Sequence, residues 1–139
     1  MLLTDLNLGG CKQVRDLTPL QGMPLTRLNL DGCPLRDLTP LKGMPLTTLY
    51  LSGCFQVSDL TPLHGMPLTK LDLSGCDQVR DLTPLEAMNL TEVLFTPKNI
   101  TKGIGVLRQM KSLNSIGLNG GNKWRPTEFW KKYDAGEFK

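Results

Sequence analysis

The stretch from Leu25 to Pro45, LTRLNLDGCPLRDLTPLKGMP, is repeated along most of this chain. Close copies begin at Leu3, Leu46 and Leu68, and a weaker copy begins at Leu90. The five starting leucines are 22, 21, 22 and 22 residues apart. Self-similarity at a fixed period of this size indicates a solenoid, in which each unit buries its apolar side chains against its neighbours.

The first part of each unit alternates leucines with polar residues, a period of two that is typical of a half-buried strand. In the second unit Leu28 and Leu30 point inward, whereas Arg27, Asn29 and Asp31 point outward. We expect strands at Asp5–Gly9, Arg27–Asp31, Thr48–Ser52, Lys70–Ser74, Glu92–Thr96 and Ser115–Asn119. Because every unit runs in the same direction, these strands should form one parallel sheet whose polar residues line the concave side.

The second part of each unit, D-L-T-P-L-x-G-M-P, predicts one turn of 3₁₀ helix on the convex side. Thr is a favoured N-cap, and Pro is preferred at the first helical position. The Gly can adopt a positive φ that ends the turn, and the second Pro prevents the helix from continuing. We expect the acids at the start of these turns to cap the backbone rather than to bind a metal. They are Asp16, Asp37, Asp59 and Asp81.

The whole unit, L-x-x-L-x-L-x-x-C followed by D-L-T-P-L-x-G-M-P, resembles the 22-residue, internalin-like class of bacterial leucine-rich repeats over residues 1–90. Residues 126–139 resemble the C-terminal end of large bacterial repeat proteins, many of which carry a Ser/Thr protein kinase domain upstream. The resemblance implies an α/β solenoid, a leucine-rich-repeat arc that ends in a C-terminal capping helix. The chain itself contains no glycine-rich phosphate loop, no H-R-D and no D-F-G.

We interpret residues 1–139 as a single domain: four regular repeats in 1–89, two irregular repeats in 90–121 and a C-terminal cap in 122–139. Thr101 should begin a helix that runs to about Lys111. A capping helix is expected from Thr127 to Ala135, with Thr127 as the N-cap and Gly136 as the stop. Aromatic side chains around this helix should form a lid over the last repeat: Trp124, Phe129, Trp130 and Tyr133.

One cysteine occurs in each regular repeat, at Cys11, Cys33, Cys54 and Cys76. The long spacings do not suit zinc, which needs closely spaced pairs. We therefore expect free, inward-facing thiols that bond to the backbone of the bend, as in a reducing compartment. No signal peptide and no apolar run of about 18 residues is present, so a cytoplasmic location is expected and no membrane is predicted as a partner.

The sequence offers little for catalysis. The one histidine, His64, occupies a turn position where the other repeats carry Gln21, Lys42 and Glu86. No Ser/His/Asp or Cys/His arrangement can be built around it, so we predict that the chain is not an enzyme. We likewise predict no cofactor and no metal.

The concave face is the usual ligand surface of a solenoid. Tyr50 is the only aromatic residue at its centre, and Tyr and Arg contribute strongly to binding at interfaces. We predict a non-catalytic protein-interaction module whose binding residues are Arg27, Asn29, Tyr50, Lys70 and Asp72, with Phe55 at the rim.

Two alternatives remain open. Residues 97–139 carry nine Lys and Arg against three acids, so nucleic acid or another anionic surface could bind there, although we regard nucleic acid as the less favoured partner. The cations concerned are Lys123, Arg125, Lys131 and Lys132. Alternatively, the chain could be a scaffold or spacer within a larger regulatory protein.

The first strand, Asp5–Gly9, is expected to have an open edge that can pair with another strand. A homodimer could form by antiparallel pairing about Asn7, which places Asp5 opposite Gly9 without a clash of like charges. We expect the inward residues of this repeat to be half exposed. They are Leu6, Leu8, Val14, Leu17 and Leu20.

Overall fold

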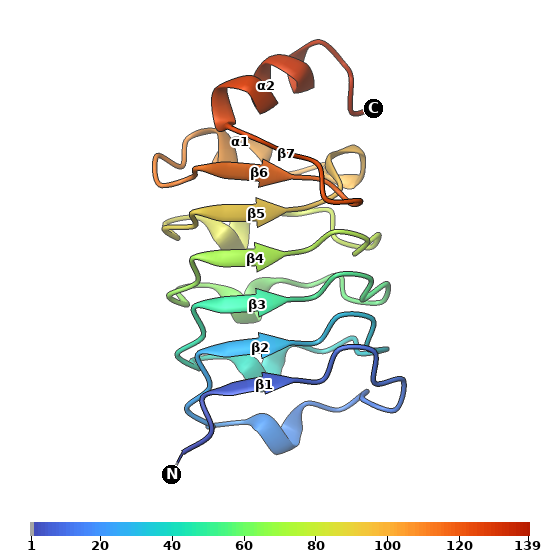
Figure 1. Ribbon diagram of the computed structural model, residues 1–139, viewed down its shortest axis with the longest axis vertical. Helices are drawn as coiled ribbons and strands as arrows, with labels where there is room; N and C mark the ends of the chain where they lie inside the picture. The colour runs from blue at the N-terminus through green and yellow to red at the C-terminus, as the bar shows by residue number, and fades with distance from the viewer. Residues whose placement is uncertain (1) are drawn as a thin grey trace.

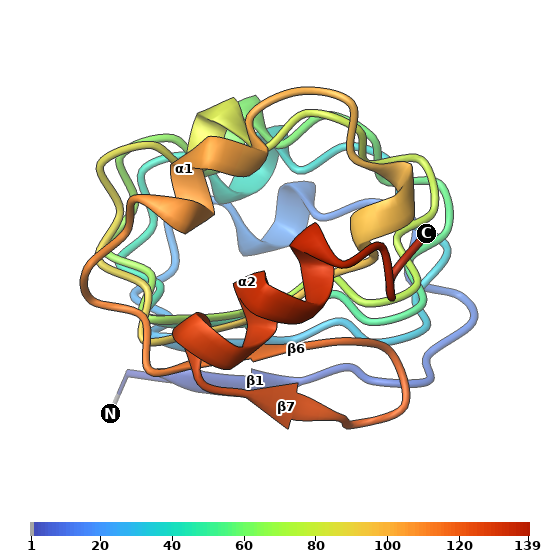
Figure 2. The same cartoon turned by 90° about the horizontal axis from the view of Figure 1, so that it is seen from above.

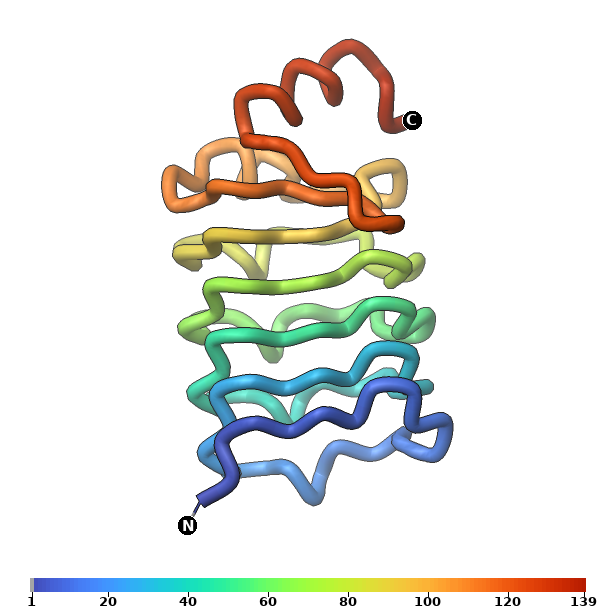
Figure 3. Tube along the Cα trace, viewed as in Figure 1, coloured from blue at the N-terminus to red at the C-terminus, as the bar shows by residue number. Residues whose placement is uncertain are grey.

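A computed structural model describes residues 2–139, and in this range the chain forms a seven-stranded sheet whose strands follow the order of the sequence (Figure 1). The strands are β1 (Asp5–Asn7), β2 (Arg27–Asn29), β3 (Thr48–Tyr50), β4 (Lys70–Asp72), β5 (Glu92–Leu94), β6 (Ser115–Gly117) and β7 (Lys123–Trp124). Strands β1 to β6 are parallel, as the repeated unit predicts, and they stack as successive coils of one solenoid-like arc (Figure 3).

Each regular strand covers three residues rather than the predicted five. The hydrogen bonding between neighbouring coils nevertheless continues, since the N–H of Leu8 donates to the carbonyl of Asn29 at 2.8 Å. Beyond the strand, the Asn29 side chain accepts a bond from the N–H of Asp31 at 2.8 Å. This side-chain bond turns the chain into the bend and shortens the regular strand.

The second repeat is one residue shorter than its neighbours, yet the register of the sheet does not change. Leu28 pairs with Leu6 on one side and with Leu49 on the other. The missing residue lies in the bend, where Pro34 leads directly to the fully buried Leu35. The difference in length is therefore absorbed outside the sheet.

The four regular repeats each carry a 3₁₀ turn on the side of the coil opposite the sheet (Figure 2). These turns are η1 (Thr18–Leu20), η2 (Thr39–Leu41), η3 (Thr61–Leu63) and η4 (Thr83–Leu85). The prediction that Thr is the N-cap is wrong, because Thr18 is the first residue of its turn and Leu17 precedes it. The carboxylate of Asp16 instead accepts the N–H of Thr18 at 2.9 Å, and the same bond recurs in every regular repeat.

The leucine columns form one continuous buried core, into which Cys33, Cys54 and Cys76 project, whereas the expectation of an inward-facing thiol is wrong for Cys11. All four thiols are free; Cys33, Cys54 and Cys76 are buried and Cys11 is exposed. Cys54 donates from Sγ to the carbonyl of Leu30, which begins the bend of the preceding repeat, at 3.2 Å. Burial raises the pKa of the Cys54 thiol to about 11 and that of Cys76 to about 12.

The chain departs from the repeat after β5. A fifth turn, η5 (Pro97–Asn99), is followed by the short helix α1 (Ile104–Arg108). The predicted helix from Thr101 to Lys111 is therefore too long: it begins only after Gly103, which has a φ of 85°. Thr101 does not cap it, because the N-cap is Gly103, and the N–H of Thr101 bonds across to the carbonyl of Arg80. The antiparallel strand β7 was not predicted.

Helix α2 (Pro126–Asp134) lies across the end of the last coil (Figure 2). Its N-cap is Arg125 and not Thr127, because Pro126 already occupies the first helical position. Phe129 is fully buried, and its ring centre lies 4.9 Å from that of Trp130 and 5.0 Å from that of Phe138. The predicted aromatic lid is thus present, with Phe95 and Phe138 as further members.

The opposite end of the stack has no comparable cover within residues 2–139. Strand β1 pairs with β2 alone, and the side chains of Leu2 and Leu3 are 75% and 49% exposed. Leu6, Leu8 and Val14 are half-buried, as expected. The expectation for Leu17 and Leu20 is wrong, because η1 packs against η2 and buries both.

Candidate interaction surface

The outward side chains of the strands form the sheet face, which we define by two rows that cross the strands. The first row is Asp5, Arg27, Thr48, Lys70, Glu92 and Ser115; the second is Asn7, Asn29, Tyr50, Asp72, Leu94 and Gly117. The middle residue of each strand points into the core, which leaves these two rows on the outside. Thr48 differs from the expectation of an open position, since only 6% of it is exposed.

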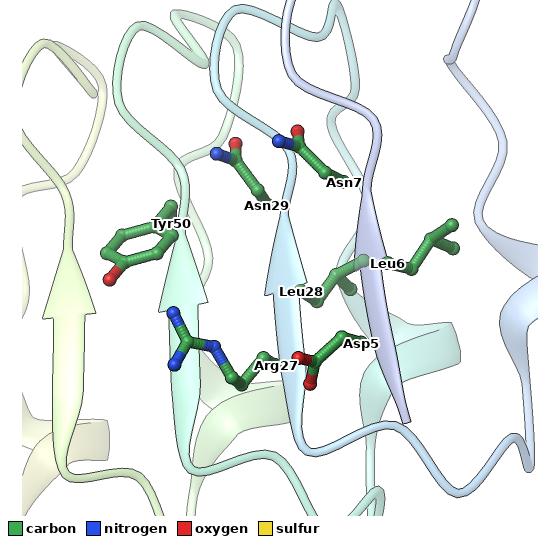
Figure 4. A pocket seen from close by; sticks show the side chains of 7 residues that line it. All are labelled: Asp5, Leu6, Asn7, Arg27, Leu28, Asn29 and Tyr50. Carbon is green, nitrogen blue, oxygen red and sulfur yellow. The ribbon is translucent and has the colours of Figure 1, made fainter. Parts of the chain in front are cut away.

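Two depressions meet at Tyr50 on the sheet face. The first, of about 290 Å³, is lined by side chains of β1 and β2 together with Tyr50 (Figure 4). The second, of about 280 Å³, is lined by side chains of β4 and β5, Tyr50 and Lys123. Five of the six residues predicted to bind a partner therefore line these two depressions: Arg27, Asn29, Tyr50, Lys70 and Asp72.

Acids at the carboxyl ends of the strands bond to the backbone. Asp31 accepts the N–H of Ser52 at 2.8 Å. Asp72 accepts both the N–H and the hydroxyl of Ser74, at 2.9 and 2.6 Å. Partial burial, with added repulsion from Asp72, raises the pKa of Asp31. These carboxylates are structural parts of the bends, which reduces their freedom to turn toward a ligand.

Strand β7 adds a cation to the sheet face that the sequence reasoning did not place there. The hairpin between β6 and β7 brings Nζ of Lys123 to 2.5 Å from the carboxylate of Glu92. The hydrogen bond with Glu92 raises the pKa of Lys123. A signal for this hairpin was present in the dipeptide Gly120-Gly121, because two residues with positive φ suit a tight hairpin turn.

Phe55 lies apart from the other predicted binding residues. Its side chain is 64% exposed in the bend after β3. It lines a separate depression of about 370 Å³ with Arg36, Gln56, Ser58 and Gln78. This depression adjoins the shortened bend of the second repeat, where Arg36 donates to the side-chain oxygen of Gln56 at 2.9 Å.

Of the four basic C-terminal residues proposed to bind an anion, two form ion pairs. Lys123 pairs with Glu92, and Lys132 lies 3.3 Å from Glu137. Arg125 and Lys131 are exposed. The aromatic rings nearby pack on one another, and the guanidinium of Arg108 covers the ring of Trp130 at 4.6 Å. Two of the four cations proposed for nucleic acid are thus held in ion pairs, and the rings pack into the lid.

The Asn7 side chain occupies part of the hydrogen-bonding edge of β1. The N–H of Gly9 donates to the side-chain oxygen of Asn7 at 2.9 Å. Asp5, Asn7 and Gly9 are all exposed. Any strand that paired here would first have to displace this bond at Gly9.

Across residues 2–139, no group of three or more His, Cys, Asp or Glu side chains is placed so that it could hold a metal ion. Over the same range, none of the helices has the length and apolar character needed to cross a bilayer. No protein-family model matches the chain, and no curated protein sequence matches it either.

Proposed function

We propose that this chain is a leucine-rich-repeat module that binds a protein partner on its sheet face and does no chemistry of its own. One observation carries the proposal: two open depressions converge on Tyr50, with cationic side chains on either side of it. Tyr offers a large, rigid contact area with a polar tip, and Arg offers a planar set of donors. Both residue types often dominate the binding energy of interfaces.

The proposal is supported by how the face is built. The backbone beneath it is held by the parallel sheet and the buried leucine column. A partner would therefore meet a preorganised surface and would lose little free energy in ordering it. The repeat pattern of the sequence supports the leucine-rich-repeat class, whose solenoids bind ligands over extended surfaces of this kind.

Affinity capture followed by quantitative mass spectrometry tests the function. The wild type is compared with Tyr50→Ala/Lys70→Glu and with a control, Lys42→Glu/His64→Ala, that alters exposed turn residues on the other side of the coil. We expect a partner that the wild type and the control retain and the sheet-face variant loses. Identical partner sets for all three proteins would contradict the site and favour the scaffold or spacer alternative.

We also propose that β1 can pair with β1 of a second copy to make a symmetric dimer. The observation that favours it is the one-sided pairing of β1 beside the exposed Leu2 and Leu3. Light scattering at high micromolar concentration should show a dimer that Asn7→Pro abolishes, because Pro cannot donate a backbone hydrogen bond. A monomer, or a dimer that Asn7→Pro leaves intact, would contradict this pairing.

A further inference from the structure

We infer that the sheet face recognises a single acidic side chain of a protein partner, held between Arg27 and Lys70. This inference rests on the proposed function and specifies the chemistry of the partner. It follows from which charges on the face are already engaged and which are not.

The two cations lack acidic partners. Within residues 2–139 the ion pairs are Arg108 with Asp134, Lys123 with Glu92, and Lys132 with Glu137. Neither Arg27 nor Lys70 takes part in any of them, and both are exposed. Asp5 lies opposite Arg27 in the register, but the Arg27 side chain extends away from it, over β3 and below Tyr50 (Figure 4).

The acids nearest to Lys70 are engaged elsewhere. Glu92 lies opposite Lys70 on the neighbouring strand, but its carboxylate binds Lys123. Asp72 holds the N–H and hydroxyl of Ser74. The unpredicted strand β7 is therefore what leaves Lys70 without a counter-ion, because it supplies Glu92 with a different cation.

The spacing of the two cations suits one carboxylate. Arg27, Thr48 and Lys70 occupy successive strands in one row. Neighbouring strands lie about 4.8 Å apart, so the α-carbons of the two cations are about 10 Å apart. Thr48 between them is almost completely buried, and the Arg27 side chain extends over its strand (Figure 4). A carboxylate beside the two cationic head groups could take paired bonds from the guanidinium and a charge-assisted bond from the ammonium.

The arrangement of charge along the row limits the partner further. Asp5 flanks Arg27 on one side, and the ion pair of Glu92 with Lys123 flanks Lys70 on the other. A polyanion such as a nucleic acid would place phosphates against Asp5 and against an acid that already has its cation. An apolar or basic partner would bury or repel the two unpaired cations at a cost in free energy. A single acidic side chain among neutral residues would pair with Arg27 and Lys70 and would place no further negative charge against Asp5 or Glu92.

The test is a titration of the ¹⁵N-labelled protein, followed by NMR, with three blocked hexapeptides of sequence Ser-Gly-Tyr-X-Gly-Ser. X is Glu, Gln or Lys, so that only the central charge differs. We expect the Glu peptide to give saturable shifts at the amides of Arg27, Thr48, Tyr50 and Lys70. The Gln peptide should bind at least about fivefold more weakly. Equal binding of the Glu and Gln peptides, or no saturable shift with the Glu peptide, would overturn the inference.

Charge reversal supplies a second readout. Arg27→Glu/Lys70→Glu should lose the Glu peptide and gain saturable binding of the Lys peptide. Arg15→Glu/Lys42→Glu carries the same change of charge at exposed positions away from the sheet face and should keep the wild-type preference. Loss of the Glu peptide in both variants would show nonspecific attraction and overturn the inference.

A titration with oligothymidine tests whether the sheet face prefers a nucleic acid to an acidic side chain. Tighter binding of the oligonucleotide than of the Glu peptide at Thr48 and Tyr50 would overturn the inference in favour of nucleic acid. Failure of the peptides while affinity capture still depends on Tyr50 would reject only the acidic chemistry. Failure of both experiments would reject the proposed function itself.

Discussion

The two ends of this stack differ in how the apolar face of the terminal coil is covered. At the C-terminal end, α2 and β7 cover the last coil, and Phe129 is fully buried among other aromatic rings. At the N-terminal end of the described chain, β1 has one neighbour, and Leu2 is 75% exposed. The regular repeats between them are nearly identical in sequence. The difference teaches that the energetic value of a given position depends on how many coils flank it and not on the repeat alone.

The largest effect is expected at the covered end. Phe129→Ala should lower the free energy of unfolding by about 3–5 kcal/mol, because it removes a buried ring and leaves a cavity. Phe55→Ala is a matched control, since that ring is 64% exposed and should change stability little. Urea denaturation measures both variants. A loss at Phe129 no larger than at Phe55 would show that the aromatic lid contributes little.

The same substitution at equivalent strand positions compares the two ends directly. Leu71→Ala in β4, where the side chain is 1% exposed, should cost about 2–5 kcal/mol. Leu6→Ala occupies the equivalent position in β1 but packs on one side only, so roughly half that loss is expected. Chemical denaturation of the two proteins gives the answer. Equal losses would mean that the β1 end is covered in solution, for instance by a second copy.

A smaller effect separates the third regular turn from the fourth, in which alanine replaces the glycine. Gly65 and Ala87 occupy equivalent positions with φ values of 77° and 66°. A Cβ added at Gly65 would meet nothing within 4 Å, so the cost of a side chain there is conformational. Gly65→Ala should destabilise by about 1 kcal/mol, and Ala87→Gly should stabilise by a similar or smaller amount.

Thermal melting of this pair shows whether the two changes have opposite signs. A loss of stability in Ala87→Gly would contradict the comparison. It would imply that the methyl group of Ala87 packs usefully beside Met88 and Met110, which line the same depression.

The smallest effect concerns pH. Bonds from the hydroxyl and N–H of Thr61 hold the pKa of Asp59 below its ordinary value of 3.8. Because the folded-state pKa is lowered, the stabilisation is present above that value and is lost as pH falls through the folded pKa. Asp59→Asn keeps an oxygen acceptor but cannot titrate.

Denaturation measured from neutral pH to below 3.8 should therefore show a shallower acid loss for Asp59→Asn than for the wild type. Asp16→Asn, in the repeat at the open end, should behave in the same way, since bonds from Thr18 also lower the pKa of Asp16. An unchanged acid profile in both variants would show that the turn carboxylates do not contribute to acid stability.

The regular repeats could be predicted because each local signal agrees with the others. The spacing of Leu28 and Leu30 identifies the strand, and the D-L-T-P-L segment identifies the turn. Beyond residue 90 the signals conflict. Thr101 resembles a helix cap, yet its N–H is used by the neighbouring coil at Arg80. Tertiary contacts of this kind cannot be read from local sequence.

The candidate site shows the same division. The register of the strands brings Arg27, Tyr50 and Lys70 together, and a repeat of known period predicts that register. The pairing of Glu92 with Lys123 depends on the hairpin of β6 and β7, which is not part of the repeat. The repeat pattern therefore could not predict that a cation would be added to the sheet face. Phe55 was also predicted to contact the partner, but it lies in the bend after β3, outside the sheet face.

The short bend of the second repeat also shows where the chain can change its length. Leu28 keeps its register with both neighbours although this bend has one residue fewer than the others. Natural or engineered insertions at Pro34 would therefore project from the flank and leave the two rows of the sheet face intact. A loop grafted there could carry a label or a second binding sequence at a fixed distance from Tyr50.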